Sequence, residues 1–199
     1  MTVLYITYDG LLDPLGPSQI LPYIKDISRH QEEVVVVSFE KSKQLLHGKD
    51  VLLSDLQNYP IEWKPLLFTK GLGILGKLLD LSRMYLTAFI IVCKHNVRVV
   101  HTRSHPPAQA GLFVKRITKA KFIFDFRGLW VDERVDKGGW DLSYFFHRLQ
   151  YRFFKRVERK LLNQSDHVVV LTNKVVNEVL DKITIMQLYD LINSKIISY

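Results

Sequence analysis

The sequence predicts an α/β protein built of three layers, with helices covering both faces of a mostly parallel sheet. Short runs of β-branched and other apolar residues recur along the 199-residue chain, and segments with apolar residues at helical spacing separate these runs. Alternation of strands and helices in this order is typical of parallel sheets. Apolar residues make up 47% of the chain and charged residues 24%, which is the composition of an ordinary globular protein.

Six short segments are predicted to be strands. The clearest contains the four valines at 34–37, because a strand buried on both faces of a parallel sheet is apolar throughout. Residues 61–64 alternate between apolar and polar side chains, which predicts a more exposed strand. The predicted strands are residues 3–7, 34–39, 61–64, 97–102, 121–126 and 167–171.

Helices are predicted between and after these strands, at residues 18–29, 42–57, 72–94, 106–118, 140–163 and 173–182. Ser18 is the expected N-cap of the first helix. Pro106 and Pro107 suit the first turn of the fourth helix, where a backbone N–H is not needed. With right-handed connections between parallel strands, this order of elements predicts a Rossmann-like three-layer sandwich.

The chain contains no internal linker rich in proline, glycine or serine, so we expect one domain over residues 1–182. Residues 183–199 show little periodicity. They are expected to form either a closing helix or the tail of a truncated product.

The formal net charge is +8 and the pI is about 9.5. A basic balance favours phosphate groups, nucleic acid or an anionic membrane as partners. No helix-turn-helix signature, zinc-ligand spacing or RNP-like aromatic strand is found in the sequence, so nucleic acid is not an expected partner.

The cysteine content and the apolar stretches bear on location. Cys93 is the only cysteine, which excludes a disulfide within the chain, and its apolar neighbours predict a buried structural thiol in a reducing compartment. The longest uncharged, mainly apolar stretch, residues 84–93, is far shorter than the ~20 residues of a membrane-spanning helix. The first residues do not resemble a signal peptide. We therefore expect a cytoplasmic protein, either free or peripheral at the inner face of the membrane.

Ligands of open parallel sheets bind at the carboxyl ends of the strands, so the residues after each strand are the first candidates for a site. Two glycines and two prolines make the loop after the first strand tight, and free N–H groups in the following helical turn would suit an anion or a sugar hydroxyl. The alternative is a connecting loop with a capping serine. The loop is not a GxGxxG motif, so a dinucleotide site is not expected. The binding candidates are Asp9, Gly10, Gly16, Ser18 and Gln19.

After the fourth strand, Arg103 and Ser104 are binding candidates. A guanidinium at a strand end can hold a phosphate through two parallel hydrogen bonds. His101 lies inside the strand, and we expect it to be a hydrogen-bonded core residue.

The segment after the fifth strand is the most highly charged of the strand ends, with three acids and two arginines within ten residues. Asp125 could orient Arg127 or accept a hydrogen bond from a sugar hydroxyl, and Trp130 could stack on a sugar or close the core. The alternative is a salt-bridged corner that precedes the next helix. No metal-ligand spacing is evident, and no metal is expected. The candidates here are Asp125, Arg127, Trp130, Asp132, Glu133 and Arg134.

The predicted helix at 140–163 carries most of the excess positive charge. Its buried stripe is predicted to consist of Leu142, Phe146, Leu149, Phe153, Val157 and Leu161. The basic residues off that stripe, interleaved with Phe145 and Phe154, are candidates for facing an anionic membrane. The alternative is an ordinary solvated face. These membrane-facing candidates are Arg148, Arg152, Lys155, Arg156 and Arg159.

Five segments of the chain resemble, in order, the N-terminal domain of family 4 glycosyltransferases, which have the GT-B fold. They read YITYDGLLDPLGPSQILPYI, VVVVSFEK, HTRSHPPAQAG, FIFDFRGLWVDER and SDHVVVLT, and the resemblance covers residues 1–180. It implies the acceptor-side half of a two-domain enzyme that transfers sugar from a nucleotide-sugar co-substrate, with retention and without a cofactor or essential metal. Many members act on lipid-linked or cell-envelope glycans at the inner membrane face.

The resemblance also implies roles for particular residues. Gly10 and Gly16 would lie near acceptor and donor phosphates, and Asp125 and Arg127 would occupy the position where relatives often present a catalytic or acceptor-contacting histidine. That histidine is absent here, as is the paired-glutamate motif of the donor-binding domain. We therefore expect the chain to be inactive until a separate donor-binding domain joins it. The alternative functions are a catalytically inactive, membrane-peripheral binding module and, less favoured because no Walker loop is present, a phosphoryl-handling enzyme.

Overall fold

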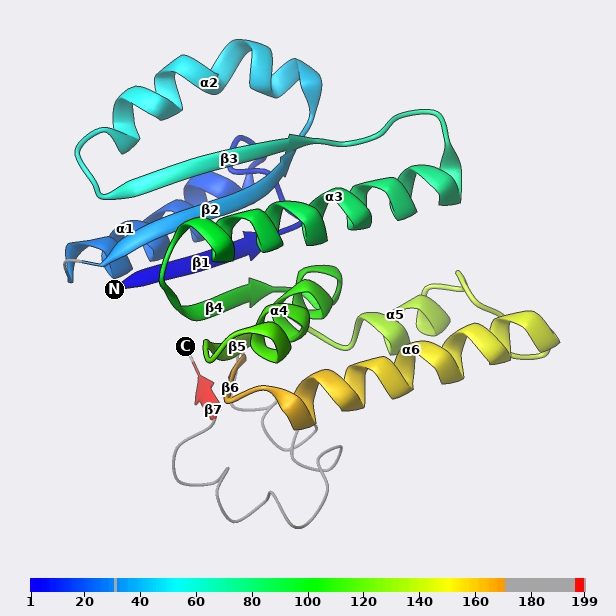
Figure 1. Cartoon of the computed structure of the whole chain (residues 1–199). Coiled ribbons are helices and arrows are strands. Elements are labelled where there is room, and N and C mark those ends of the chain that lie inside the picture. Colours follow the sequence, from blue (N-terminus) through cyan, green and yellow to red (C-terminus); the bar gives the residue numbers. More distant parts are fainter. Residues whose placement is uncertain (31, 171–195, 199) are drawn as a thin grey trace. The chain divides into compact units, whose positions relative to one another are not determined.

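The structure is a computed structural model that describes residues 1–30, 32–170 and 196–198 (Figure 1). The chain divides into two compact units, Met1–Phe122 and Ile123–Tyr199. Each unit is described in turn.

The first unit is built on four parallel strands in the order β3-β2-β1-β4. In the register of these strands, Leu4 of β1 lies between Val35 of β2 and Val100 of β4. The valine-rich β2 is buried along nearly its whole length, as expected for a strand with helices on both faces. The strands are β1 (Thr2–Thr7), β2 (Glu33–Glu40), β3 (Ile61–Leu67) and β4 (Val97–Arg103), and each coincides with a predicted strand.

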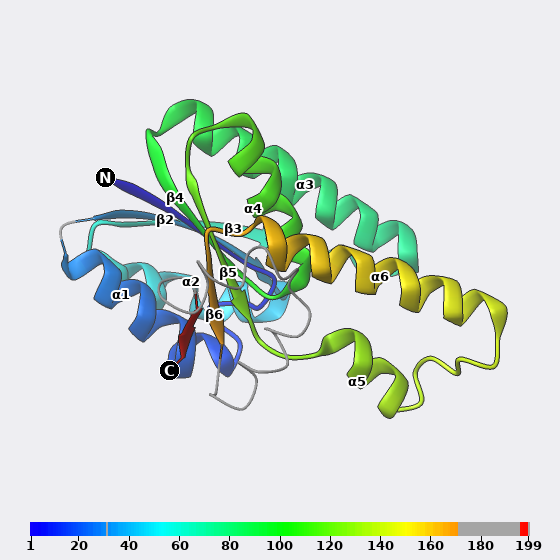
Figure 2. The same ribbon diagram turned by 90° about the horizontal axis from the view of Figure 1, so that it is seen from below.

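Helices cover both faces of this sheet, with α1 and α2 on one face and α3 and α4 on the other (Figure 2). Alternation of side chains along a strand explains the division, because Val3 and Tyr5 point into the core shared with Ile24 of α1 and Leu52 of α2. The helical elements are η1 (Gly16–Ile20, a π-helical segment), α1 (Leu21–Arg29), α2 (Ser42–Leu56), α3 (Gly73–Lys94) and α4 (His105–Ile117). The predicted α/β, Rossmann-like fold is confirmed.

Asp80 anchors α3 to the end of the sheet. The buried side of this helix is a single stripe at a spacing of three or four residues: Gly76, Asp80, Met84, Ala88 and Ile91. The Asp80 carboxylate accepts hydrogen bonds from Thr69 N at 3.0 Å and Thr69 Oγ1 at 2.7 Å, and from the Tyr8 hydroxyl at 3.3 Å. A buried carboxylate is tolerated here because several donors surround it.

The second unit contains parallel strands paired in the order β5-β6-β7, with Phe124 opposite Val168 and Val168 opposite Ile196. Two helices precede β6, and a tyrosine and a lysine of the longer one hydrogen-bond Asp132 of the shorter one. The elements are β5 (Lys121–Phe126), α5 (Trp130–Asp136), α6 (Phe145–Gln164), β6 (His167–Val170) and β7 (Ile196–Ser198).

Several sequence-based expectations about local structure are wrong. Ser18 does not cap the first helix, because the helical segment already begins at Gly16 and the Ser18 hydroxyl donates to the carbonyl of Pro14 at 2.8 Å. Cys93 is exposed rather than buried, since α3 turns its Met84 side to the core. The short helix α5 was not expected. The predicted helix at 173–182 lies outside the described residues, as does most of the segment 183–199.

The buried stripe predicted for α6 is wrong over most of its length. Phe146, Leu149 and Phe153 are exposed, whereas Leu161 is buried as predicted, together with Glu158 and Leu162. The helix is turned this way because Tyr151 and Lys155, on the side away from Phe153, hydrogen-bond the carboxylate of Asp132 in α5.

Candidate functional site

Three predicted binding residues of the first unit meet at the carboxyl ends of β1 and β4. Arg103, the last residue of β4, donates from Nε to Asp9 Oδ2 at 3.2 Å and from Nη2 to Gln19 Oε1 at 2.7 Å. The two strands are parallel neighbours, so their carboxyl ends lie at the same edge. The Arg103 side chain is 4% exposed and that of Asp9 is 39% exposed. The cluster therefore presents a carboxylate to solvent and holds it with a buried cation.

The loop between β1 and η1 is packed too closely for any residue but glycine at two points. A Cβ atom added at Gly10 would lie 2.6 Å from Glu40 Oε2, and one added at Gly16 would lie 1.9 Å from the carbonyl oxygen of Leu11. The N–H of Gly16 donates to the carbonyl of Asp13 at 2.8 Å, and Pro17 has no N–H. Two positions of the helical turn expected to bind an anion are thus unavailable for that purpose.

Glu40 is a positioning residue that the sequence analysis missed. This buried carboxylate at the end of β2 accepts hydrogen bonds from the backbone N–H groups of Leu11 at 2.7 Å and Leu12 at 3.3 Å. It also accepts one from the Ser38 hydroxyl at 2.6 Å, and Ser38 in turn accepts from Trp63 Nε1 at 2.8 Å. Glu40 therefore fixes the loop that carries Asp9. The sequence shows an acid directly after the predicted strand at 34–39, but nothing in it indicates the loop that this acid holds.

Ser104 joins β4 to α4 with a strained backbone. Its φ of 72° makes it the only residue other than glycine with positive φ among those the structure describes. Strained residues of this kind persist where the surrounding structure fixes them, and they gather at functional sites. The neighbouring His101 is buried and hydrogen-bonded to the Tyr23 hydroxyl at 3.2 Å, which confirms its prediction as a core residue.

In the second unit, Asp125 and Arg127 form an ion pair at the end of β5. Arg127 Nε donates to Asp125 Oδ2 at 2.9 Å, and Arg127 Nη2 lies 2.7 Å from the same oxygen. The Asp125 side chain is 1% exposed and that of Arg127 is 19% exposed. Gly128 follows with a φ of 147°, which allows the chain to turn sharply into α5. This pair therefore exposes part of a guanidinium to solvent, whereas the Asp9–Arg103 pair exposes a carboxylate.

Trp130 lies in an aromatic cluster. Its ring is perpendicular to Trp140, at a centroid distance of 5.8 Å, and to Phe154, at 5.2 Å. Trp140 and Phe154 stack at 5.6 Å, and the guanidinium of Arg134 lies 5.6 Å from the centre of the Trp130 ring. These contacts favour a packing role for Trp130, in which it joins α5 to α6.

The acids of α5 also form ion pairs. Asp132 accepts hydrogen bonds from the Tyr151 hydroxyl at 2.9 Å and from Lys155 Nζ at 2.8 Å, and Glu133 pairs with Lys137 at 2.7 Å. Burial disfavours the charged form of Lys155, but its hydrogen bonds to Asp132 and Glu158 outweigh that effect and raise its pKa. Burial and the hydrogen bond to Asp132 raise the pKa of Tyr151.

The membrane-facing candidates of α6 differ in their surroundings. Lys155 points inward and is paired as described above, with its side chain 23% exposed. The other four, Arg148, Arg152, Arg156 and Arg159, are exposed.

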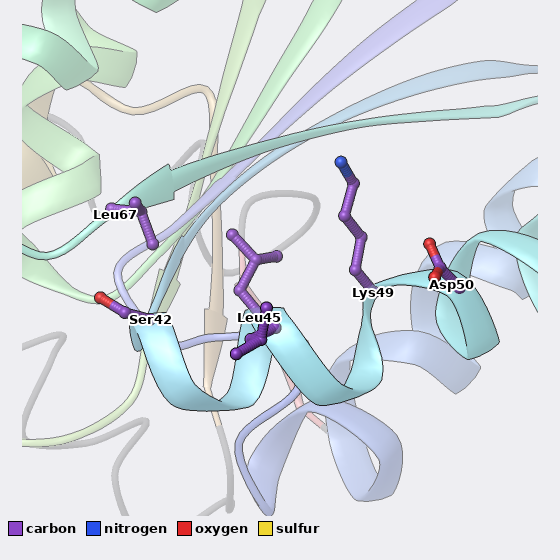
Figure 3. A pocket seen from close by; sticks show the side chains of 6 residues that line it. Ser42, Leu45, Lys49, Asp50 and Leu67 are labelled. Carbon is purple, nitrogen blue, oxygen red and sulfur yellow. The ribbon is translucent and has the colours of Figure 1, made fainter.

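Two pockets of the first unit lie away from the predicted site. One, of about 370 Å³, lies between α2 and the end of β3, where Leu45, Lys49 and Leu67 line it (Figure 3). Another, of about 510 Å³, lies at the amino ends of β1 and β4, opposite the end that carries Arg103. Within the described part of the chain, no group of three or more histidine, cysteine or acidic side chains is arranged to hold a metal ion. In that same part, no helix is both long and apolar enough to cross a bilayer.

Comparison with known proteins identifies the class of protein that has this fold. Two solved structures share the fold: Alr3699/HepE of Anabaena in complex with UDP (15% identity, TM-score 0.53) and apo UGT2 of Phytolacca americana (12% identity, TM-score 0.57). The match covers 92% and 100% of this chain but only 41% and 51% of theirs. A search among curated proteins found no similar sequence.

The α/β fold is thus that of one half of a GT-B glycosyltransferase. The family defined as the glycosyl transferase 4-like domain matches residues 28–184, well over half of the chain. The chain belongs to this family.

Proposed function

We propose that this chain is the acceptor-binding half of a retaining glycosyltransferase, which transfers a sugar from a nucleotide-sugar donor to a glycan or lipid-linked acceptor. Family membership and the arrangement of polar side chains at the strand ends support the proposal. The donor would be a co-substrate, and neither a cofactor nor a metal would take part. A second, donor-binding domain is required, and the chain spans only 41% and 51% of the two similar structures.

The observation that carries the proposal is the cluster of Asp9, Gln19 and Arg103. A half-exposed carboxylate accepts hydrogen bonds from sugar hydroxyls, and the buried Arg103 guanidinium holds that carboxylate in one orientation. Glu40 fixes the loop that bears Asp9. Such a group suits recognition of an acceptor hydroxyl at the carboxyl end of a parallel sheet.

We assign the catalytic role to Arg127, with Asp125 as the residue that positions it. Sugar transfer from a nucleotide sugar develops negative charge on the departing diphosphate, and a fixed guanidinium stabilises such charge. A hydrogen bond and an ion-pair contact with the buried Asp125 carboxylate fix the direction of the Arg127 side chain.

A cytoplasmic enzyme of cell-envelope polysaccharide synthesis, working at the inner face of the membrane, is the setting we propose. The excess positive charge of the chain, +8, supports contact with phosphate-bearing acceptors.

The test is ligand-observed saturation-transfer NMR with glucose, galactose, N-acetylglucosamine and their 1-phosphates. We expect weak, saturable binding of at least one of these sugars to the wild-type chain, and its loss in Asp9→Asn. Asp26→Asn removes the same charge from an exposed position on α1 and is the matched control. Equal signals from the Asp9 and Asp26 variants would remove the cluster from consideration.

A second measurement separates the two halves of the reaction. Calorimetric titration with UDP-glucose and GDP-mannose is expected to give no saturable binding, because the proposal places the donor on another domain. Tight binding of either nucleotide sugar by this chain would contradict the acceptor-side assignment.

A catalytically inactive, membrane-peripheral binding module is the second candidate function. The exposed cationic and aromatic side chains of α6 favour it. The sugar-binding measurement distinguishes the two candidate functions, because an inactive membrane-binding module does not need to bind sugar.

A further inference from the structure

The outward side of α6 combines exposed aromatic and cationic side chains in a way that a solvated helix does not need. Phe145, Phe146, Leu149 and Phe153 are 65%, 75%, 52% and 55% exposed. Large apolar side chains scattered singly are common on protein surfaces, but a contiguous group marks a contact site. These four, with the exposed Arg148, Arg152, Arg156, Arg159 and Lys160, are here termed the basic aromatic face.

Helical geometry places these side chains on one side of α6. At 100° per residue, the nine positions fall within about half of the helix circumference, with Arg148 at one border and Phe146 at the other. The buried residues Glu158, Leu161 and Leu162 lie on the remaining half. Apolar and cationic side chains therefore reach the same surface.

The basic aromatic face carries no negative charge. Glu158 is the only acid between Phe145 and Gln164, and it is 1% exposed and paired with Lys155 at 2.8 Å. The ion pair of Lys155 with Asp132 of α5 also holds the helix in this rotation. The result is a rigid helix with five exposed cations among four apolar side chains.

We propose that the basic aromatic face docks on the surface of an anionic lipid bilayer, with α6 lying in the plane of the interface. Arginine and lysine side chains attract anionic headgroups while their alkyl stems lie along the apolar boundary, and the phenylalanines enter the acyl region. The cations favour a negatively charged partner. The exposed phenylalanines favour a bilayer over a soluble polyanion, because only a bilayer offers an apolar interior. The inference deepens the second candidate function, the membrane-peripheral module, and does not depend on the proposed transferase activity.

The test is sedimentation of the whole chain with vesicles of equal parts phosphatidylglycerol and phosphatidylcholine, against vesicles of phosphatidylcholine alone. Binding to the anionic vesicles is expected to be at least tenfold tighter and to fall as salt is added, since five cations contribute. Equal binding to both vesicle types, or no binding, would overturn the proposal.

Paired substitutions locate the surface. Arg148→Gln with Arg152→Gln is expected to weaken anionic-vesicle binding about tenfold, and Phe145→Ser with Phe146→Ser by a similar factor. The matched controls lie on α2, where Lys43→Gln with Lys49→Gln and Leu46→Ser with Val51→Ser change equally exposed residues. Circular dichroism verifies that each variant is folded.

Two further outcomes would overturn the proposal, one by removing the surface from α6 and the other by removing the bilayer as its partner. One is that the α2 pairs weaken vesicle binding as much as the α6 pairs do. The other is that a single-stranded RNA homopolymer binds the chain as tightly as the anionic vesicles and that the Phe145→Ser, Phe146→Ser variant retains this binding, since a polyanion needs the cations alone.

Discussion

Both units end a parallel strand with an arginine–aspartate pair, but they bury opposite members of it. In the first unit the guanidinium of Arg103 is buried and the carboxylate of Asp9 reaches solvent. In the second unit the carboxylate of Asp125 is buried and the guanidinium of Arg127 is the more exposed partner. The same two residue types therefore present a hydrogen-bond acceptor in one unit and a cation in the other.

The two pairs also differ in how they are built. Arg103 and Asp9 are 94 residues apart in the chain, and Gln19 joins them from η1, so the contact exists only when β1, β4 and the loop are all in place. Asp125 and Arg127 are two residues apart, so that pair shapes a single turn. Long-range support makes the first pair part of the sheet, whereas the second depends on local backbone geometry.

The largest expected effect comes from removing the support of the first pair. Glu40→Ala is expected to lower the free energy of unfolding by about 3 kcal/mol, because two backbone N–H groups in the buried loop lose their acceptor at about 1–3 kcal/mol each. Glu40→Gln retains one acceptor oxygen and should lose less. Urea denaturation measures both. A loss below that of a typical surface substitution would show that the loop is held by other contacts.

Breaking the second pair is expected to cost somewhat less. Arg127→Met should lower the free energy of unfolding by about 2 kcal/mol, since removal of one partner leaves a buried carboxylate and the partly exposed site admits some water. The double variant Asp125→Asn, Arg127→Met removes the charge as well and should recover part of the loss. If the double variant is less stable than the single one, the carboxylate does not depend on Arg127.

Asp9→Asn tests the exposed member of the first pair, and its effect on stability should be small. Asparagine keeps an oxygen that accepts the hydrogen bond from Arg103, and the exposed half of the side chain stays in water. We expect a loss of about 0.5 kcal/mol in urea denaturation. The variant is therefore suited to the binding measurements above, and a loss as large as that of Arg127→Met would contradict the distinction between the pairs.

The sequence predicts the sheet well because each strand of the first unit carries its own local signal. The valines of β2 and the strand-to-helix alternation suffice for the fold class. The predicted strand ends also make Asp9, Gln19 and Arg103 candidates. Asp9 follows β1, Gln19 lies in the helical turn after that loop, and Arg103 ends β4. That Arg103 contacts both of the others depends on side-chain geometry that periodicity does not contain.

The rotation of α6 and the role of Glu40 could not be predicted for a related reason. Apolar spacing on α6 favours burial of Phe146, Leu149 and Phe153, but hydrogen bonds from Tyr151 and Lys155 to Asp132 decide which side faces inward. Glu40 shares no motif with the loop it holds, because its partners are backbone groups 28 and 29 residues away. On α6, polar contacts with α5 determine a rotation that the apolar pattern does not predict. At Glu40, polar contacts hold a loop for which the apolar pattern gives no information.

The smallest expected effect concerns two tyrosines that extend the comparison. Tyr8 in the first unit donates to the buried Asp80, and burial, followed by the charge of Asp80 and the hydrogen bond to it, raises its pKa from 10.0 to about 12. In the second unit Tyr151 donates to Asp132, but the nearby Lys155 opposes the rise in its pKa.

Because the pKa of Tyr8 is raised in the folded state, the unfolded chain loses this proton first when the pH increases. Its stabilising contribution is complete below pH 10 and is lost as the pH rises towards 12. The wild type should therefore lose stability between pH 10 and 12, whereas Tyr8→Phe should not lose this contribution. The difference in free energy of unfolding between the two, measured by urea denaturation, should become smaller over that interval. Tyr151→Phe is the control, with a smaller change expected. A constant difference for Tyr8→Phe between these pH values would show that Asp80 does not hold the phenol in its protonated form.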